Sequence, residues 1–199
     1  MTMTIWRPRS LGVLLAVLLM FSTAAHAETA DTERSGIESV AVRLAYGQGD
    51  RHNLTFASFV PALGMFLPAF IDRPLATYHL HASWTSEVIV SGITDGTSTV
   101  EAGLNPLFFS VRYDRGQALV PFVEGGEGLL YTDLRGQGLG TRFQFSSQAG
   151  AGLHWFVRPR LALTAAYRLR HISNAGITDH NRGLNTDFFM LGAVYFATR

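Results

Sequence analysis

The sequence has no cysteine, few charged residues and almost no net charge. Of its 199 residues, 16% are charged, 47% are hydrophobic, and the formal net charge is +1. The absence of cysteine excludes disulfides, thiolate catalysis and cysteine-based zinc sites. A net charge this small provides no basic field of the kind that binds nucleic acid, so we expect no nucleic-acid partner.

Long apolar runs are also absent after the first 27 residues, where no stretch could cross a bilayer as a helix. The first residues instead have the three parts of a secretory signal peptide. Two arginines precede an apolar run over residues 11–21, and Ala25-His26-Ala27 then fits the A-x-A cleavage pattern. This run is shorter than the roughly 20 residues of a spanning helix. We therefore predict a signal peptide over residues 1–27, followed by a loosely ordered segment over residues 28–38.

From residue 39 onward, apolar and polar residues alternate between turn-forming residues. Alternation with period two marks a β-strand that has one apolar and one polar face. Most of these runs reach the roughly 9–11 residues that a tilted membrane strand needs. We therefore predict one all-β domain, residues 39–199, that folds as an eight-stranded antiparallel β-barrel. The predicted strands cover residues 39–47, 51–59, 76–91, 98–113, 118–132, 141–157, 160–173 and 186–197.

The alternation by itself fits both a soluble barrel and a transmembrane barrel of the outer-membrane type. In the first, apolar side chains fill the interior; in the second, they face lipid and polar side chains fill the lumen. The signal peptide, the strand lengths and aromatic residues near strand ends (Trp84, Trp155 and Tyr195) favour the outer membrane. In such a barrel we expect Glu87 and Glu124 to pair with lumen arginines. The candidate arginines are Arg43, Arg142 and Arg168.

Connection lengths predict which end of the barrel faces outward. Short connections at residues 114–117 and 158–159 are typical of the periplasmic end, and longer ones at 132–140 and 174–185 of the extracellular end. The apolar segment 60–75 is too long for a periplasmic turn. It either lies in the membrane interface or belongs to an extended second strand.

The seventh predicted strand carries a candidate catalytic pair. Its odd positions are apolar, and His171 and Ser173 continue that series at the outer end of the strand. Side chains two residues apart on one face stand about 7 Å apart at their Cβ atoms, because a strand rises about 3.3 Å per residue. An imidazole can bend across that gap and take the serine proton. The alternative is a pair of ordinary interfacial polar residues.

Several motifs of this region resemble those of the PagL-type outer-membrane lipid A 3-O-deacylases. The motifs are His171-x-Ser173-Asn174-Ala175-Gly176, Asn181-x-Gly183, and a last strand that ends Val194-Tyr195-Phe196. The resemblance extends over about residues 39–196. It implies a serine esterase on the lipid-facing exterior of the barrel, which removes the ester-linked acyl chain at position 3 of lipid A in lipopolysaccharide.

The resemblance also implies roles for individual residues. Ser173 would be the nucleophile, His171 the general base, and Asn174 and Gly176 part of the segment that stabilises the oxyanion. No metal and no diffusible cofactor is required. The implied partner is the lipopolysaccharide of the outer leaflet, met by a chain embedded in the membrane after signal-peptide cleavage, and a homodimer is one form of assembly to test.

One position departs from the family, which has a glutamate where this chain has Asn185. An asparagine can accept the imidazole N–H and hold the ring, but it adds no negative charge. Asp187, two residues further on the same strand face, and Asp179 in the loop are alternative sources of that charge. Glu127 is another carboxylate on the lipid-facing side, about 10 Å away on the fifth strand.

Three functions therefore stay open at this stage. The first is a lipid A ester hydrolase, favoured because both reacting residues are present. The second is a non-catalytic small barrel, structural or lipid-binding, that has lost the acidic member of the triad. A phospholipase is the third, because an outward-facing site also meets glycerophospholipid esters.

Overall fold

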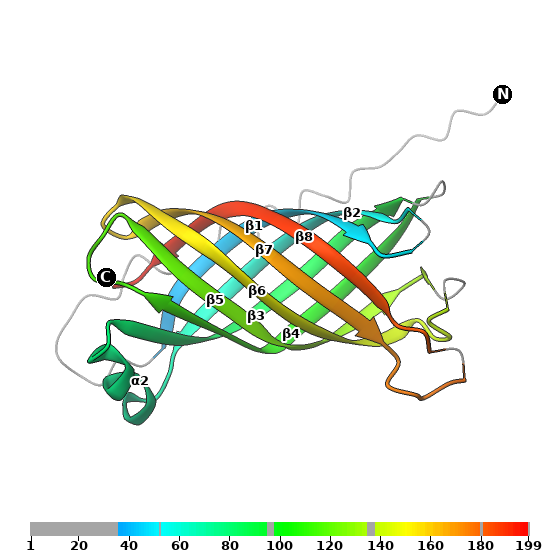
Figure 1. Ribbon diagram of the computed structural model, residues 1–199, viewed down its shortest axis with the longest axis horizontal. Coiled ribbons are helices and arrows are strands. Elements are labelled where there is room, and N and C mark those ends of the chain that lie inside the picture. The colour runs from blue at the N-terminus through cyan, green and yellow to red at the C-terminus, as the bar shows by residue number, and fades with distance from the viewer. Residues whose placement is uncertain (1–35, 52, 95–97, 135–137, 180, 199) are drawn as a thin grey trace. The chain divides into compact units, whose positions relative to one another are not determined.

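The chain forms a closed barrel in which each strand pairs with its neighbours in sequence and β1 pairs with β8 (Figure 1). All of these pairings are antiparallel. This computed structural model describes residues 36–51, 53–94, 98–134, 138–179 and 181–198. The elements are β1 (Ile37–Gly49), β2 (Thr55–Phe66), α2 (Ala69–Ala76), β3 (Leu80–Thr94), β4 (Ser98–Tyr113), β5 (Leu119–Thr132), β6 (Phe143–Arg158), β7 (Leu161–Ser173) and β8 (Leu184–Phe196).

The predicted eight-stranded antiparallel barrel is thus confirmed. Its first strand begins at Ile37, inside the segment that we predicted to be loosely ordered. The predicted signal peptide, residues 1–27, lies outside the described residues.

Strand β2 continues to Phe66 instead of ending near residue 59, which confirms the alternative of an extended second strand for residues 60–66. Proline cannot donate to a strand ladder. The pairing of β2 with β1 nevertheless runs through Pro61, opposite Val42. On the other side, the pairs with β3 skip residues 60 and 61, which is where a missing donor can be tolerated.

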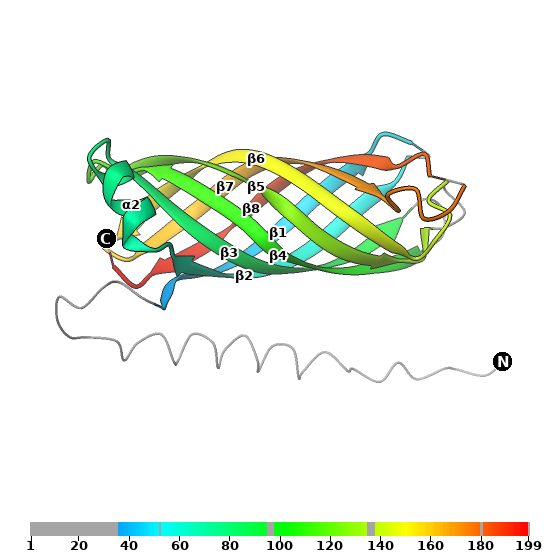
Figure 2. The ribbon, with the colours of Figure 1, turned by 90° about the horizontal axis from the view of Figure 1, so that it is seen from below.

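A short helix, α2, was not predicted and accounts for the rest of the apolar 60–75 segment. It follows Pro68, and none of its residues is buried; the Phe70 side chain is 78% exposed. Because of α2, β3 begins at Leu80 and not near residue 76. Figures 1 and 2 show α2 at one end of the barrel and the connection that follows β7 at the other. Among the described residues, no helix is long and apolar enough to cross a membrane.

The wall of the barrel has an apolar outer face, and its buried charged side chains lie inside, together with a buried apolar cluster that includes Phe56, Phe122 and Ile172. In β7, Leu163, Tyr167 and Leu169 are about half exposed, whereas Arg168 and Arg170 are each 1% exposed. A soluble barrel would show the reverse arrangement, and an apolar outer wall is the surface that lipid covers. The prediction of an outer-membrane type of barrel is therefore confirmed over the alternative of a soluble one.

Aromatic side chains mark the end of the wall that carries α2. Trp84 lies near the start of β3, Trp155 near the end of β6 and Tyr195 near the end of β8. Both tryptophans are exposed, and the Trp84 indole N–H donates to the carbonyl of Pro106. Aromatic residues in these places form the girdle that membrane barrels have at the lipid–water interface.

Inside the lumen, two arginines and two glutamates form a closed set of ion pairs, which we term the lumen ion-pair cluster. Arg43 lies 2.6 Å from Glu87 and 2.8 Å from Glu124, and Arg168 lies 2.5 Å and 2.6 Å from the same two carboxylates. Arg142, which we had included among the lumen arginines, is exposed and pairs with a carboxylate of its own connection at 2.9 Å. That part of the prediction was wrong because Arg142 precedes β6, so the alternation of side chains along this strand does not direct it into the lumen.

Candidate active site

A row of polar side chains crosses the apolar outer wall from β5 to β8, and we term it the outer polar row. It consists of Glu127, Ser147, His171 and Asn185, all of which are exposed. The strand registers place Glu127 opposite Ser147, Ser147 opposite His171, and His171 opposite Asn185. Barrel pairing thus brings together, on a surface made for lipid, four polar residues that are well separated in the sequence.

His171 and Asn185 are in direct contact. The distance from His171 Nδ1 to Asn185 Oδ1 is 2.7 Å. An amide oxygen can only accept a hydrogen bond, so Nδ1 carries a proton, and in the neutral imidazole Nε2 then has the lone pair. A neutral imidazole in this tautomer can act as a base through Nε2.

Gly183 packs against the side of the ring that carries Nε2. A Cβ atom at this position would lie 2.5 Å from His171 Cε1 and 2.9 Å from His171 Nε2. Its backbone φ is +60°, in the left-handed region that side chains rarely adopt. Both facts require glycine here, so the connection before β8 helps to fix the position of the imidazole.

Ser173 is the last residue of β7 and lies on the same face as His171. It is half-buried and pairs with Phe145 of β6. Among the described residues, no hydrogen bond joins the Ser173 hydroxyl to His171. Such contacts are often long in enzymes without substrate, and a rotation of either side chain can close the gap.

Asn174 and Gly176 hold the connection between β7 and β8 together. Asn174 is fully buried, and its Nδ2 donates to Leu139 O at 2.9 Å and to Thr178 Oγ1 at 2.7 Å. Its backbone N–H donates to Asn181 Oδ1 at 3.0 Å, and the N–H of Gly176 donates to Asn174 Oδ1 at 2.9 Å. These donors already have acceptors, so a role at the oxyanion stays a prediction that requires one of these bonds to open.

Neither alternative carboxylate contacts His171 in the described part of the chain. Asp187 accepts a hydrogen bond from the Tyr167 hydroxyl at 2.9 Å, and it lies opposite Leu169, two residues from His171. Asp179 is exposed in the connection after β7.

The carboxylate that does contact the site is Asp50, which sequence reasoning missed. Asn185 Nδ2 donates to Asp50 Oδ2 at 2.7 Å. Asp50 directly follows β1, and the pairing of β1 with β8 ends close by, at Gly49 opposite Thr186. The only sequence signal was the closure of the barrel, which must bring the end of the first strand beside the start of the last.

Glu127 and Ser147 extend the site away from Asn185. The Ser147 hydroxyl donates to Glu127 Oε2 at 2.8 Å. A groove of about 370 Å³ runs along this part of the wall. Its lining includes Glu127, Ser147, Ala149, Leu169, His171 and Asn185. The groove therefore combines polar groups with the apolar surface that an acyl chain would contact.

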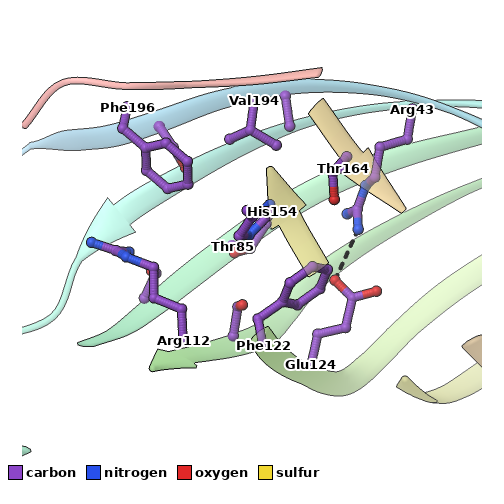
Figure 3. A pocket seen from close by; sticks show the side chains of 13 residues that line it. Arg43, Thr85, Arg112, Phe122, Glu124, His154, Thr164, Val194 and Phe196 are labelled. Carbon is purple, nitrogen blue, oxygen red and sulfur yellow. Dashed lines mark hydrogen bonds and ion pairs between the residues drawn. The ribbon is translucent and has the colours of Figure 1, made fainter. Parts of the chain in front are cut away.

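A second cavity lies inside the barrel, between Arg43, Glu124 and His154 (Figure 3). Its volume is about 50 Å³, and the imidazole of His154 stacks on the ring of Phe122 at 4.2 Å between centroids. This space is enough for a water or two but not for a lipid. The outer groove is therefore the candidate site for a lipid substrate.

Comparison with known proteins identifies the family. A sequence model of the family described as PagL, lipid A 3-O-deacylase, matches residues 67–193, which is more than half of the chain. The crystal structure of the outer membrane enzyme PagL has a TM-score of 0.64 and 18% sequence identity, and the match covers 76% of this chain and 97% of that one. Neisserial surface protein A, NspA, has a TM-score of 0.53 and 13% identity, with 81% and 99% covered. Curated proteins gave no sequence match.

At these identities the two crystal structures show the fold alone, which is that of an outer-membrane barrel. The sequence match goes further, because it includes β7, the connection after it and most of β8. It confirms the resemblance seen in the motifs around His171 and places the chain in a class of enzymes. This chain belongs to the lipid A 3-O-deacylase (PagL) family.

Proposed function

We propose that this chain is a serine esterase that removes the ester-linked acyl chain at position 3 of lipid A. The observation that carries the proposal is an imidazole held at Nδ1 by Asn185 on the lipid-facing wall, with Ser173 two residues along the same strand face. A hydrolase that acts on soluble esters has no need to expose its site to lipid. The family assignment supplies the substrate class.

In the proposed reaction, His171 Nε2 takes the proton of Ser173 Oγ as this oxygen attacks the ester carbonyl. N–H donors stabilise the oxyanion of the tetrahedral intermediate. Its collapse breaks the ester bond, and the imidazolium returns the proton to the sugar oxygen that leaves. A water activated by His171 then hydrolyses the acyl-serine, which releases the fatty acid and regenerates both residues.

The position of the site explains how the substrate would reach it. The connection after β7 lies at the opposite end of the barrel from α2, and longer connections are typical of the extracellular end of such barrels (Figure 1). His171 would then stand at the level of the outer leaflet, where lipopolysaccharide resides. Lipid A would approach along the membrane plane, with its acyl chains against Leu169 and Ala149 and its polar part near Glu127 and Ser147.

Mass spectrometry of lipid A tests the proposal. Cells that express the protein should lose the acyl chain at position 3, and cells that express the Ser173→Ala variant should keep it. Loss of acyl chains from glycerophospholipids alone would indicate the phospholipase. Unchanged lipids in the presence of a folded, membrane-inserted barrel would indicate the non-catalytic one.

Two further expectations belong to the same proposal. The signal peptide should be cleaved after Ala27, so that protein from the outer-membrane fraction begins at Glu28 on N-terminal sequencing. The homodimer stays a prediction, which crosslinking in native membranes can test.

A further inference from the structure

We propose that Asp50 provides the negative charge that Asn185 lacks and that it acts on His171 through the Asn185 amide. This inference rests on the proposed function and adds a positioning residue to it. In this arrangement the two tasks of an acidic triad member are divided. Asn185, in β8, contacts the imidazole. Asp50, in the connection between β1 and β2, orients and polarises Asn185.

Three hydrogen bonds tie Asp50 to Asn185. The side-chain bond from Asn185 Nδ2 to Asp50 Oδ2 is 2.7 Å long. The backbone N–H of Asp50 donates to Asn185 O at 2.9 Å, and the backbone N–H of Asn185 donates to Asp50 Oδ1 at 3.3 Å. With two backbone contacts beside it, the side-chain contact is part of a fixed link between the end of β1 and the start of β8.

The link determines which end of the amide faces His171. A side-chain amide has one accepting oxygen and one donating nitrogen, and a rotation of 180° exchanges them. A carboxylate only accepts, so Asp50 attracts the nitrogen and leaves Oδ1 pointing to the ring. Without Asp50, Asn185 could equally present its N–H₂ group, which would select the tautomer with the proton on Nε2. That tautomer cannot take the serine proton.

Through the same link, the negative charge of Asp50 also stabilises His171 when it is protonated. Attack by the serine turns His171 into an imidazolium, which is stabilised by negative charge near Nδ1. Hydrogen bonds in a chain polarise one another, so a carboxylate on the amide nitrogen makes the amide oxygen a stronger acceptor. Hydrogen bonds to ionised groups are about twice as strong as neutral ones.

Asp50 also forms an ion pair with Arg51. Arg51 Nε lies 3.4 Å from Asp50 Oδ1, the oxygen that accepts the backbone N–H of Asn185, whereas Asn185 Nδ2 binds Oδ2. Both side chains of this pair are partly exposed, at 28% and 39%, which makes the attraction weak. Arg51 also donates to the carbonyl of Arg182 at 3.2 Å, so its guanidinium is shared between Asp50 and the β7–β8 connection.

Asp50 lies outside the residues matched by the family, 67–193, whereas Asn185 lies inside them. The family match therefore includes Asn185 and says nothing of Asp50. Neither residue by itself marks a catalytic group in the sequence. It is their contact in the closed barrel that suggests compensation.

The experiment uses the full-length protein in detergent or native membranes, with two readouts. The first is kcat and KM for removal of the acyl chain at position 3 of lipid A. The second is the rate at which a lipophilic fluorophosphonate labels Ser173, which reports nucleophile activation without any assumption about the substrate.

Asp50→Asn should lower both kcat and the labelling rate by about tenfold, the factor between a neutral and a charge-assisted hydrogen bond, with KM unchanged. Asp50→Glu should retain a large part of both rates. Asp133→Asn, which removes an exposed carboxylate from a connection at the same end of the barrel, should change neither.

The effect of Asp50→Asn in a second background, Asn185→Glu, separates this role from a merely structural one. With Asn185→Glu, the imidazole would meet a carboxylate directly, and Asp50 would then oppose a second negative charge. In that background Asp50→Asn should leave the rates equal or raise them, whereas a structural contribution would be lost in both backgrounds. Equal rates for the parent and Asp50→Asn, or an equal loss with and without Asn185→Glu, would overturn the inference. If Ser173 is labelled in an Asp50-dependent way but lipid A stays intact, the substrate assignment fails and the role of Asp50 stands.

Discussion

Two of the polar groups in the barrel differ in how completely their side chains are paired with one another. In the lumen ion-pair cluster, each arginine lies within 2.8 Å of both carboxylates, and all four side chains are almost fully buried. In the outer polar row, Asn185 holds His171 through Nδ1, and the described residues show no hydrogen bond at Nε2. The arginines and glutamates of the first group pair with one another, whereas the second group includes the candidate catalytic base.

The difference follows from what each group must do. A charge buried in a narrow lumen is tolerated only when it is paired and hydrogen-bonded. Arg168 meets this condition with both Glu87 and Glu124. A polar group that faces hydrocarbon also needs partners. Where it keeps an atom without one, as at His171, that atom is available to a substrate.

The largest effect is expected from the open end of the outer polar row. Ser173→Ala should reduce lipid A deacylation by about 10³-fold or more, because a nucleophile and its base act as one unit. The barrel should stay folded, which its shift in gel mobility on heating would show. Ser147→Ala is the informative companion, since Ser147 lies directly opposite His171. If activity disappeared with Ser147→Ala and survived in Ser173→Ala, the nucleophile would be Ser147.

A substitution in the lumen ion-pair cluster should have the opposite outcome: the barrel should lose stability, and its catalytic rate should be retained. Arg168→Met leaves two buried carboxylates with one arginine, and breaking such a network costs about 3–5 kcal/mol. The unfolding midpoint in urea, measured in lipid vesicles, should fall, while kcat per folded molecule stays at the parent value. Arg142→Met is the matched control, because this exposed arginine pairs only at the surface, and it should leave the midpoint unchanged. A large loss of kcat in folded Arg168→Met would mean that the two groups are coupled.

The separation of the two groups could be predicted from the sequence because strand alternation is local. Arg168 and His171 are three residues apart and therefore have opposite parity, which places one inside and the other outside. Strand β7 was predicted over residues 160–173 and is observed at Leu161–Ser173. The position of Asn185 beside the seventh strand followed from pairing antiparallel neighbours.

The contacts that depend on the whole barrel could not be predicted. Asp50 and Asn185 are 135 residues apart, and their contact requires the register between β1 and β8. The stagger of a barrel is set jointly by all of its strands and is not visible in the pattern of any one. The helix α2 was missed for a different reason: the apolar segment 60–75 was assigned either to the membrane interface or to an extended second strand, and the third strand was predicted from residue 76 onward.

A smaller effect is expected where the backbone supports His171. Gly183→Ala would place a methyl group against the ring and force a residue into a left-handed conformation. A displacement of about 1 Å at a catalytic group can cost roughly 10²-fold in rate, so kcat should fall by about that factor. Gly116→Ala tests backbone strain alone, since Gly116 also has a positive φ, +86°, but no atom within 4 Å of the added Cβ. It should leave kcat unchanged, and an equal loss in both variants would point to general instability.

The smallest effect should come from Asp187, which lies on the outer wall but has a partner of its own. Its Oδ1 accepts the Tyr167 hydroxyl hydrogen at 2.9 Å, so this pair resembles the lumen cluster in being satisfied, although it faces lipid. Asp187→Asn keeps an acceptor for Tyr167 and removes a charge that does not contact His171, so kcat should stay within about twofold, since substitutions away from special features cost within about 0.5 kcal/mol. Asn185→Ala, by contrast, removes the only acceptor that the described residues offer to Nδ1 and should lower kcat clearly. If Asp187→Asn abolished deacylation and Asn185→Ala were silent, the imidazole would turn to Asp187 during the reaction. The distinction between open and satisfied polar groups would then fail on the outer wall, where the two kinds lie two residues apart.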